Sequence, residues 1–506
     1  MYLVVNLGLK SIRGIVFNEH GKQMYASSRA VYSKLLGDKV EQDATEWKNK
    51  LESILQEIGA IDTLSNKIEY ITSTTSSSCI YGANNEANPL TKVMMVSDKR
   101  ASKEAEEIEQ IIRTKNSSSK LHCPASSIIP KALWFKRNKT KVFENITHWM
   151  GAGEFLNFYF TGEVFTDALN ASKGLYENGS YLKNIIDTLE LDVKSLPEVK
   201  DIGHEFSILS SVKNNYGFAD NCKYVLTTYD AICAVIGSYD GEENTACDVS
   251  GTVTSVRVLS NSGLNNERKG SILSQKLGNH NKYLIGASNN LGGGIIEWLK
   301  QAFYDEKDKN VYYIMENNAH EISLGANGIL FLPYMLGERS PFKSPNARGV
   351  FFGIDRSSTI KEFSRAVFES TAYVSNDLLQ LIISNGVQID SMSVSGGLAR
   401  FDLINQIKAD VTNKRIKVIE NFESTAVGAF ILLMVSLKKF NSIEEAASKI
   451  IKIRKIINPS SENHSIYSEF FDFYKKLNEQ LLPIYNEHLH LKKQIQSFSL
   501  ETISNL

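Results

Sequence analysis

The sequence predicts an α/β protein with two large domains. Its 506 residues are too many for a single hydrophobic core. Hydrophobic residues make up 42% of the chain and charged residues 22%, which is the balance of a soluble globular protein. Two strand–turn–strand patterns occur, one at the amino terminus and one about 240 residues later. This repetition favours two domains of related architecture.

The first domain is expected to start with a hairpin. β-branched runs at residues 2–7 and 12–17 flank Gly8, and residues 23–31 add a third strand. Asp43 is suited to cap a helix that runs to Gly59 with its apolar residues on one face. The remaining elements expected here are strands at 68–73 and 93–96, a charged, solvent-facing helix at 98–114, helices at 131–137 and 154–160, and short helices within 164–220.

A small-residue, helix-like run within residues 225–238, opened by Asp230, precedes the second domain. Its small residues Ala231, Ala234 and Gly237 recur at helical spacing, which lets a helix approach a neighbour closely. Residues 247–259 then repeat the strand–turn–strand pattern. The remaining elements expected are strands at 283–287 and 391–394, helices at 295–304, 360–385, 401–412 and 425–438, and a polar tail from residue 487.

Composition excludes several classes of protein. The formal net charge is −1 and the 56 basic residues are scattered, whereas a nucleic-acid binder needs a basic stripe. The sequence has neither a run of roughly 18 apolar residues nor a basic amino-terminal signal region, so we expect no membrane association and a cytoplasmic protein. The five cysteines are widely spaced without a CxxC pair, which indicates reduced thiols rather than zinc ligands or disulfides.

Two motifs identify a family resemblance. RGVFFGIDRSSTIKEFSRAVFES (residues 348–370) and LPYMLGERSP (residues 332–341) resemble signature segments of the FGGY family of carbohydrate kinases. This family belongs to the actin-like, ribonuclease-H-like ATPase superfamily, and the resemblance extends from residue 1 to about 480. It implies two ribonuclease-H-like α/β lobes joined near residues 239–246, with a cleft that closes around the reactants. The expected boundaries are residues 1–243 for the sugar-binding lobe, 244–486 for the nucleotide-binding lobe and 487–506 for the tail.

The resemblance implies ATP as the phosphoryl donor. A glycine pair, Gly396-Gly397, follows a strand and opens a helix, so its backbone N–H groups suit an anionic or planar ligand. With Glu423–Ala429 it is similar to the family's adenosine motif, and Gly293 lies in a second glycine-rich segment. Plain turns remain the alternative for both segments. The nucleotide residues carried over here are Gly293, Gly396, Gly397, Ala399 and Arg400.

Two turns resemble the phosphate-binding hairpins of the superfamily. The second is intact at residues 248–252, with Gly251 and Thr252 as expected phosphate contacts. The first is altered, because Asn6 replaces an acid that helps to hold Mg²⁺ and Leu9 replaces a hydroxyl residue. Positive side chains in this turn could face phosphate instead, although Lys10 also suits an ordinary solvated turn. The nucleotide residues expected in the first turn are Gly8, Lys10, Ser11 and Arg13.

Asp230 matches the family's general base. Phosphoryl transfer depends mainly on positioning and charge stabilisation, so a carboxylate of ordinary pKa can accept the hydroxyl proton. We therefore expect Asp230 to contact the sugar and, with Asn6, to hold the metal ion. The alternative role for an Asp before an apolar run is a helix N-cap.

The sugar pocket departs from the xylulose kinase pattern. Ser78 stands where such members have His, and Val96 where they have Trp, while Asp98 and Arg100 are retained. Serine hydroxyls can bind a polyol, so Ser77, Ser78, Asp98 and Arg100 are the expected substrate residues. The serine run is somewhat closer to ribulokinase-like branches, and the other interpretation is that it only ends a strand.

Two functions remain open at this point. The leading hypothesis is ATP- and Mg²⁺-dependent phosphorylation of a small ketose or polyol, with a homodimer as one open assembly state. The alternative is a kinase-derived sugar- or nucleotide-binding or regulatory protein that has lost efficient catalysis, which Asn6 and Leu9 motivate.

Overall fold

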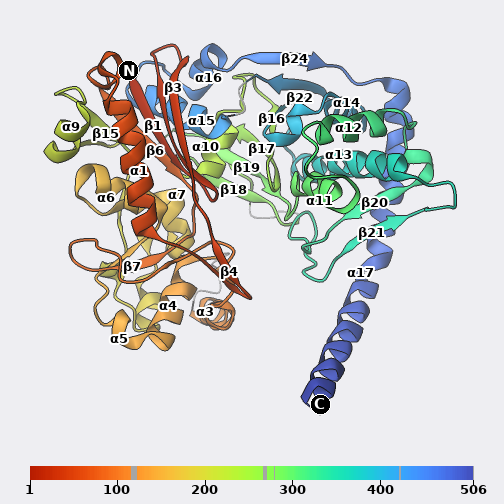
Figure 1. Ribbon diagram of the computed structural model, residues 1–506, viewed down its shortest axis with the longest axis horizontal. Helices are drawn as coiled ribbons and strands as arrows, with labels where there is room; N and C mark the ends of the chain where they lie inside the picture. Colours follow the sequence, from red (N-terminus) through yellow and green to blue (C-terminus); the bar gives the residue numbers. More distant parts are fainter. Residues whose placement is uncertain (116–121, 266–269, 279, 421–422, 505–506) are drawn as a thin grey trace. The chain divides into compact units, whose positions relative to one another are not determined.

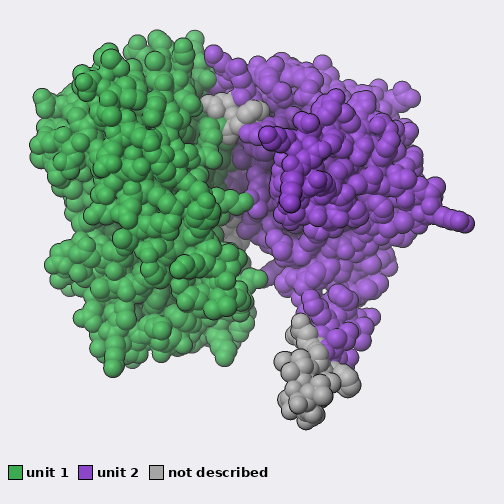
Figure 2. Space-filling model, viewed as in Figure 1, with its two compact units in different colours: residues 1–237, 277–281, 423–450 green, residues 238–276, 282–422, 451–506 purple. Residues whose placement is uncertain are grey.

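A computed structural model describes residues 1–115, 122–265, 270–278, 280–420 and 423–504. The chain forms two compact units, each assembled from separate segments (Figure 2). Unit 1 contains residues 1–237, 277–281 and 423–450, and unit 2 contains residues 238–276, 282–422 and 451–506. The lobe boundaries expected from the sequence, at 243/244 and 486/487, remain a prediction.

Unit 1 is organised around a six-stranded sheet of order β14-β15-β6-β1-β2-β3 (Figure 1). The β1–β2 hairpin and β3 are antiparallel, whereas β1, β6 and β15 run parallel. The carboxyl ends of those three strands therefore meet at one edge. The bounds are β1 Tyr2–Leu7, β2 Ser11–Phe17, β3 Gln23–Ala30, β6 Tyr70–Thr75, β14 Glu205–Ser207 and β15 Lys223–Val225.

Unit 2 repeats this strand order in a seven-stranded sheet, β18-β19-β17-β16-β22-β23-β24. An antiparallel set, β16, β17 and β19, again joins a parallel set, β16, β22 and β23. The duplicated architecture expected from the two strand–turn–strand patterns is confirmed. The bounds are β16 Thr245–Ser250, β17 Thr254–Ser260, β18 Leu273–Lys276, β19 Tyr283–Ser288, β22 Ser391–Ser395, β23 Arg415–Ile419 and β24 Ile453–Ile457.

Small sheets of two or three strands complete both units. In unit 1 these are β4 Lys34–Leu36, β5 Lys39–Gln42, β7 Tyr81–Ala83, β8 Val93–Met94, β9 His148–Met150, β10 Phe165–Asp167, β11 Tyr176–Glu177, β12 Ser180–Tyr181 and β13 Glu198–Lys200. In unit 2, β20 Leu330–Pro333 pairs with β21 Gly349–Phe352, which brings the two family signature segments together.

The helices of unit 1 cover both faces of its sheet. Side chains alternate along β1, so Leu3 lies on the face of α1, while Tyr2 packs against Phe430 of α15. The helices are α1 Ala44–Gly59, α2 Asp62–Ser65, α3 Ser102–Lys115, α4 Ile128–Asn138, α5 Thr140–Phe143, α6 Ala152–Thr161, α7 Ala168–Ala171, α8 Lys183–Thr188, α9 Ser210–Tyr216, α10 Asp230–Ile236, α15 Ser424–Ser436 and α16 Ile443–Ile450, with the short helices η1 Ser172–Gly174 and η2 Val193–Ser195.

Unit 2 is built around one long buried helix, α13. Thr359 and Glu362 form a capping box at its start, and apolar clusters lie on both sides of it. Its helices are α11 Gly294–Phe303, α12 Val311–His320, α13 Ile360–Ser384, α14 Asp402–Thr412 and α17 Ser461–Ser504, with the short helices η3 Ala326–Gly328 and η4 Gly397–Arg400. Among the helices of the described ranges, none combines the length and apolar character that a bilayer crossing needs.

Most elements lie where the sequence predicted them, with one informative shift. The helix expected from residue 98 begins at Ser102, because residues 98–101 form a loop in which the Asp98 carboxylate accepts backbone hydrogen bonds. This helix is also not simply solvent-facing, since Ile108 and Ile112 are buried. Residues 487–504, expected to form a polar tail, continue α17 rather than forming a separate element.

Two glycines allow α10 and α15 to cross closely within unit 1. A Cβ atom on Gly428 would lie 1.8 Å from the carbonyl oxygen of Cys233, and one on Gly237 would lie 1.8 Å from that of Ser424. Real side chains cannot occupy such positions, so the backbones touch directly. The expected close approach of this small-residue helix to a neighbour is confirmed, and the neighbour is α15.

Replacing Gly428 by Ala should separate these helices. We expect Gly428→Ala to destabilise the protein by about 2 kcal/mol or more, because the added methyl group forces a backbone shift. Gly174→Ala is the control, since the nearest heavy atoms to its added Cβ lie at an ordinary 3.8 Å. Thermal unfolding measures both variants, and equal melting temperatures would contradict the close crossing.

Candidate active site

Most predicted residues of unit 1, apart from Asp98 and Arg100, lie in segments that follow its parallel strands. β1 ends at Leu7, β6 at Thr75 and β15 at Val225, and the chain then enters three loops. These loops carry the first phosphate turn, the serine run that includes Ser77 and Ser78, and the approach to Asp230. Parallel strands place the loops that follow them at one edge. Residues distant in sequence are therefore brought together.

The first turn is held by backbone and side-chain bonds. Gly8 N–H donates to the Ser11 carbonyl at 3.0 Å, and the Gln42 side-chain amide donates to the Leu9 carbonyl at 2.9 Å. Lys10 is exposed. Arg13 instead bonds the Ser11 hydroxyl at 3.2 Å and forms an ion pair with Glu423 at the start of α15. The guanidinium expected to face phosphate thus already has a carboxylate partner.

Asn6 presents an unpaired oxygen at this edge. It pairs with Arg13 across β1–β2 and with Thr74 across β1–β6. Its Oδ1 atom is buried and has no hydrogen-bond partner among the described residues. A buried amide oxygen left without a donor is costly, so it suits a water molecule or a cation that binds there. An amide oxygen is an acceptable ligand for a hard cation such as Mg²⁺.

Asp230 is the first residue of α10, and Tyr229 holds the capping position. The alternative interpretation of Asp230 as the N-cap is therefore wrong. The residues before it are fixed: the Thr227 hydroxyl donates to the Ser73 carbonyl at 2.5 Å, and the Thr228 hydroxyl donates to Asp167 at 3.0 Å. Asp167 is buried, which raises the pKa of its carboxyl to about 6. The segment that leads to Asp230 is thus anchored to the sheet.

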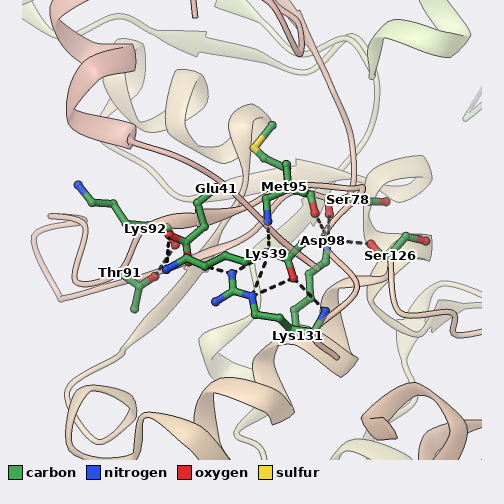
Figure 3. Close-up of polar contacts among 11 residues, drawn as sticks. Lys39, Glu41, Ser78, Thr91, Lys92, Met95, Asp98, Ser126 and Lys131 are labelled. Carbon is green, nitrogen blue, oxygen red and sulfur yellow. Dashed lines mark hydrogen bonds and ion pairs between the residues drawn. The ribbon is translucent and has the colours of Figure 1, made fainter. Parts of the chain in front are cut away.

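The predicted sugar residues lie in two loops that are close together (Figure 3). Ser77 and Ser78 are half-buried, and Ser78 adopts a left-handed backbone conformation with φ of 64°. The buried Asp98 accepts hydrogen bonds from Val40 N–H at 2.8 Å and from the Arg100 guanidinium at 2.7 Å. Arg100 also donates to Glu41 at 2.8 Å. Asp98 and Arg100 therefore bind each other and shape the loop.

Unit 2 brings its predicted nucleotide residues to one sheet edge as well. The parallel strands β16 and β22 lead into Gly251 and Gly396. Gly396 has φ of 83°, and a Cβ atom there would lie 2.6 Å from the Ser250 carbonyl oxygen. Only glycine fits this position. Gly397 and Arg400 are exposed, whereas Ala399 is buried.

The second glycine-rich segment, residues 292–294, supports the second phosphate turn through backbone hydrogen bonds. Gly292 N–H donates to the Thr252 carbonyl at 2.8 Å, and Gly293 N–H donates to the Gly251 carbonyl at 2.7 Å. A Cβ atom on Gly293 would lie 2.4 Å from the Gly251 oxygen, so the two backbones are in direct contact. Thr252 itself is exposed. In this structure Gly293 supports the turn.

A buried ion pair lies under the same turn. The Lys408 ammonium binds the Asp248 carboxylate and donates to the Ser250 hydroxyl at 3.2 Å. The Ser375 hydroxyl of α13 donates to Asp248 at 2.7 Å. Both charged side chains are almost fully buried. The carboxylate of this phosphate motif is therefore engaged in holding the turn.

The chain matches known proteins over nearly its whole length. Residues 1–237 match the N-terminal domain, and residues 249–437 the C-terminal domain, of the FGGY family of carbohydrate kinases. The chain belongs to the FGGY family. The fold, with two lobes of ribonuclease-H-like topology, and the assignment as a carbohydrate kinase are thereby confirmed.

Individual FGGY relatives are distant in sequence. A xylulose kinase of Staphylococcus epidermidis is 26% identical over 497 residues, covering 94% of this chain and 96% of that protein. A glycerol kinase of Clostridium botulinum is 28% identical over 296 residues, covering 56% and 57% of the two proteins. The solved structure of a ligand-bound xylulose kinase from Lactobacillus acidophilus superposes with a TM-score of 0.86 at 21% identity, covering 96% of this chain and 100% of that one.

Sequence reasoning missed the residues that hold the FGGY site loops. These residues bond backbone carbonyls or other buried side chains. Because most of these partners are distant in the chain, no local pattern marks the residues. Gln42, which donates to the first turn, is not among them, because its segment VEQDATEW is similar to the family's EQDP-type segment. The supporting residues that the structure adds are Lys131, Asp167, Thr227, Thr228 and Lys408.

Breaking the buried pair under the second turn should weaken nucleotide binding. Lys408→Met leaves Asp248 charged and unpaired, which should destabilise unit 2 by about 3–5 kcal/mol and distort the turn. Lys417→Met is the matched control, because Lys417 forms a buried ion pair with Asp240 in the same unit but does not contact the turn. Calorimetric titration with ATP compares them, and equal ATP affinity in the two variants would contradict a role in the turn.

Proposed function

We propose that this FGGY kinase transfers the γ-phosphoryl group of ATP to a hydroxyl of a small ketose or polyol, with Asp230 as general base. The observation that carries the proposal is the sheet edge of unit 1, where Asp230, the serine loop and the first phosphate turn all follow parallel strands. Xylulose is the first candidate, because several relatives that match most of the chain are named xylulose kinases.

Asp230 suits the role of base by its position. It opens α10 on an anchored segment, so its carboxylate is presented from a fixed backbone. In the proposed step one Asp230 oxygen accepts the proton of the attacking hydroxyl, the new O–P bond forms, and the bond to the β-phosphate oxygen breaks. ADP leaves with the electron pair. Such proton transfer contributes about 10²- to 10⁴-fold to the rate.

Nucleotide binding is assigned to unit 2. Thr252 and Gly251 are exposed residues that offer a hydroxyl and turn backbone to phosphate, and Gly397 and Arg400 are exposed at the neighbouring loop. When Mg²⁺ is bound with ATP, it neutralises phosphate charge during transfer. The residues of unit 1 proposed to hold it are Asn6, through its unpaired oxygen, and Asp230. One carboxylate and one amide oxygen are compatible with Mg²⁺, which takes few protein ligands beside phosphate and water.

Sugar recognition is assigned to the serine loop and the Asp98 loop. Ser77 and Ser78 supply hydroxyl groups to a polyol, and Asp98 with Arg100 sets the shape of the second loop. Because Ser78 and Val96 replace the His and Trp of the xylulose kinase pattern, the pocket differs in shape from that pattern. A tetrose, another pentulose or a polyol is therefore tested beside xylulose.

A second candidate function is sugar or nucleotide binding without efficient turnover. The specific observation is the first phosphate turn, where Asn6 carries no charge and Arg13 is paired with Glu423. Both changes alter the charge available to a Mg²⁺–phosphate complex. Tight ATP or sugar binding by calorimetry, together with no ADP release, would favour this function over the kinase.

Removing the base should slow turnover strongly. For the sugar found in a coupled ADP-release screen of ketoses and polyols, Asp230→Asn should lower kcat at least about 100-fold, because the amide accepts no proton. Asp201→Asn is the control, an exposed aspartate of the same unit. Full activity of Asp230→Asn, or no turnover by the wild type with any sugar, would refute the proposal.

Restoring the acid in the first turn should strengthen Mg²⁺ binding. Asn6→Asp places a carboxylate at the sheet edge, and we expect the Mg²⁺ concentration for half-maximal activity to fall roughly tenfold through added electrostatic attraction. Asn18→Asp adds the same charge beyond the opposite end of β2 and should change nothing. A Mg²⁺ titration of ADP release distinguishes them, and identical curves for both variants would contradict metal binding at residue 6.

A further inference from the structure

A fully buried lysine lies behind the two proposed sugar loops. Lys131 of α4 is 0% exposed, and its Nζ atom donates to the carbonyl oxygens of Ser78 at 2.6 Å, Met95 at 2.9 Å and Ser126 at 3.1 Å (Figure 3). These bonds use all three N–H groups of an ammonium. None of the ion pairs among the described residues involves Lys131. The buried charge is stabilised mainly by backbone dipoles.

Two of the three acceptors belong to the loops proposed to bind sugar. The Ser78 carbonyl lies in the serine loop, where Ser78 holds the left-handed conformation that non-glycine residues rarely adopt. The Met95 carbonyl also accepts the Asp98 N–H at 3.0 Å and so begins the Asp98 turn. The third acceptor, Ser126, precedes the helix of Lys131 itself. One ammonium therefore connects the serine loop, the Asp98 loop and α4.

Burying an ammonium is unfavourable unless strong hydrogen bonds compensate. Burial lowers the pKa of Lys131 to about 8, and the charged or titratable groups that act on it are Cys79, Asp98 and Arg100. An apolar side chain would fill this space at lower cost, but it would leave the Ser78 and Ser126 carbonyls without donors and the Met95 carbonyl with the Asp98 N–H alone. The lysine is thus well suited to fix loop backbones that have no regular secondary structure.

We propose that Lys131 is a positioning residue for sugar binding, which fixes the serine loop and the Asp98 loop at one spacing through the Ser78 and Met95 carbonyls. This inference rests on the proposed function, because it takes these loops as the sugar site. Lys131 itself lies beneath the loop backbones, so it acts on the sugar through them. Loss of the ammonium should therefore weaken sugar binding more than it slows phosphoryl transfer.

The direct test is amide hydrogen exchange of the full-length protein with Lys131→Met and Lys131→Gln. We expect exchange in residues 76–80 and 95–101 to rise about 10- to 100-fold in Lys131→Met, with a smaller rise in Lys131→Gln, which keeps two N–H donors. Lys136→Met is the matched control on the same helix, since Lys136 donates to the carbonyls of Leu189 and Glu190 at 3.1 Å. It should leave both loops unchanged.

The kinetic test uses D-xylulose and ATP. The KM for D-xylulose should rise about 10- to 100-fold in Lys131→Met, with kcat within about threefold and the KM for ATP unchanged. The wild-type KM should also rise above pH 8, where the ammonium loses a proton, and Lys131→Gln should lack this pH dependence.

The two tests separate the possible failures. Loop exchange equal to that of the wild type overturns the proposal, as does a uniform rise throughout unit 1 in both Lys131 variants. If the wild type phosphorylates no sugar while the two loops alone exchange faster in Lys131→Met, the positioning of the loops is supported and the proposed kinase function fails.

Discussion

Backbone carbonyls at the carboxyl ends of parallel strands need new hydrogen-bond donors, and this need organises both halves of the structure. Within a sheet, the N–H groups of neighbouring strands bond the carbonyls of each strand. The loop that follows a strand has no neighbouring strand, so its carbonyls need other donors. In unit 1 the side chains of Lys131 and Gln42 donate to loop carbonyls, beside backbone bonds such as that from Gly8 N–H to the Ser11 carbonyl. In unit 2 the backbone N–H groups of Gly292 and Gly293 donate to carbonyls of the phosphate turn. The same topology is thus stabilised by two kinds of donor.

The choice of donor fits what each loop is proposed to hold. Glycine N–H groups allow a second segment to contact the phosphate turn directly, and Thr252 remains exposed. Side-chain donors reach farther, so they can support loops of irregular shape such as the one around Ser78. Such donors let an irregular loop be held at the end of a regular sheet.

Local patterns in the sequence predicted the fold well. Alternation and helical periodicity placed β1, β2, α1 and α13 within a few residues, because these elements carry their own capping and burial signals. The family motifs also identified the loops of the candidate site. The supporting residues could not be predicted in the same way. Lys131 resembles any lysine on an amphipathic helix until its three carbonyl partners, up to 53 residues away, are known. Arg13 resembled a free cation until Glu423, 410 residues later, proved to be its partner.

The glycine crossing of α10 and α15 has a consequence for how the chain folds during synthesis. Residues 423–450 complete unit 1, yet they are made after nearly all of the unit 2 sheet. At about 5–20 residues per second, the ribosome adds α15 roughly 10 to 40 seconds after α10. During that interval the amino-terminal segment exposes the apolar surface that α15 later covers. Unit 1 can therefore finish folding only near the end of translation. The two units complete their folding at about the same time rather than one after the other.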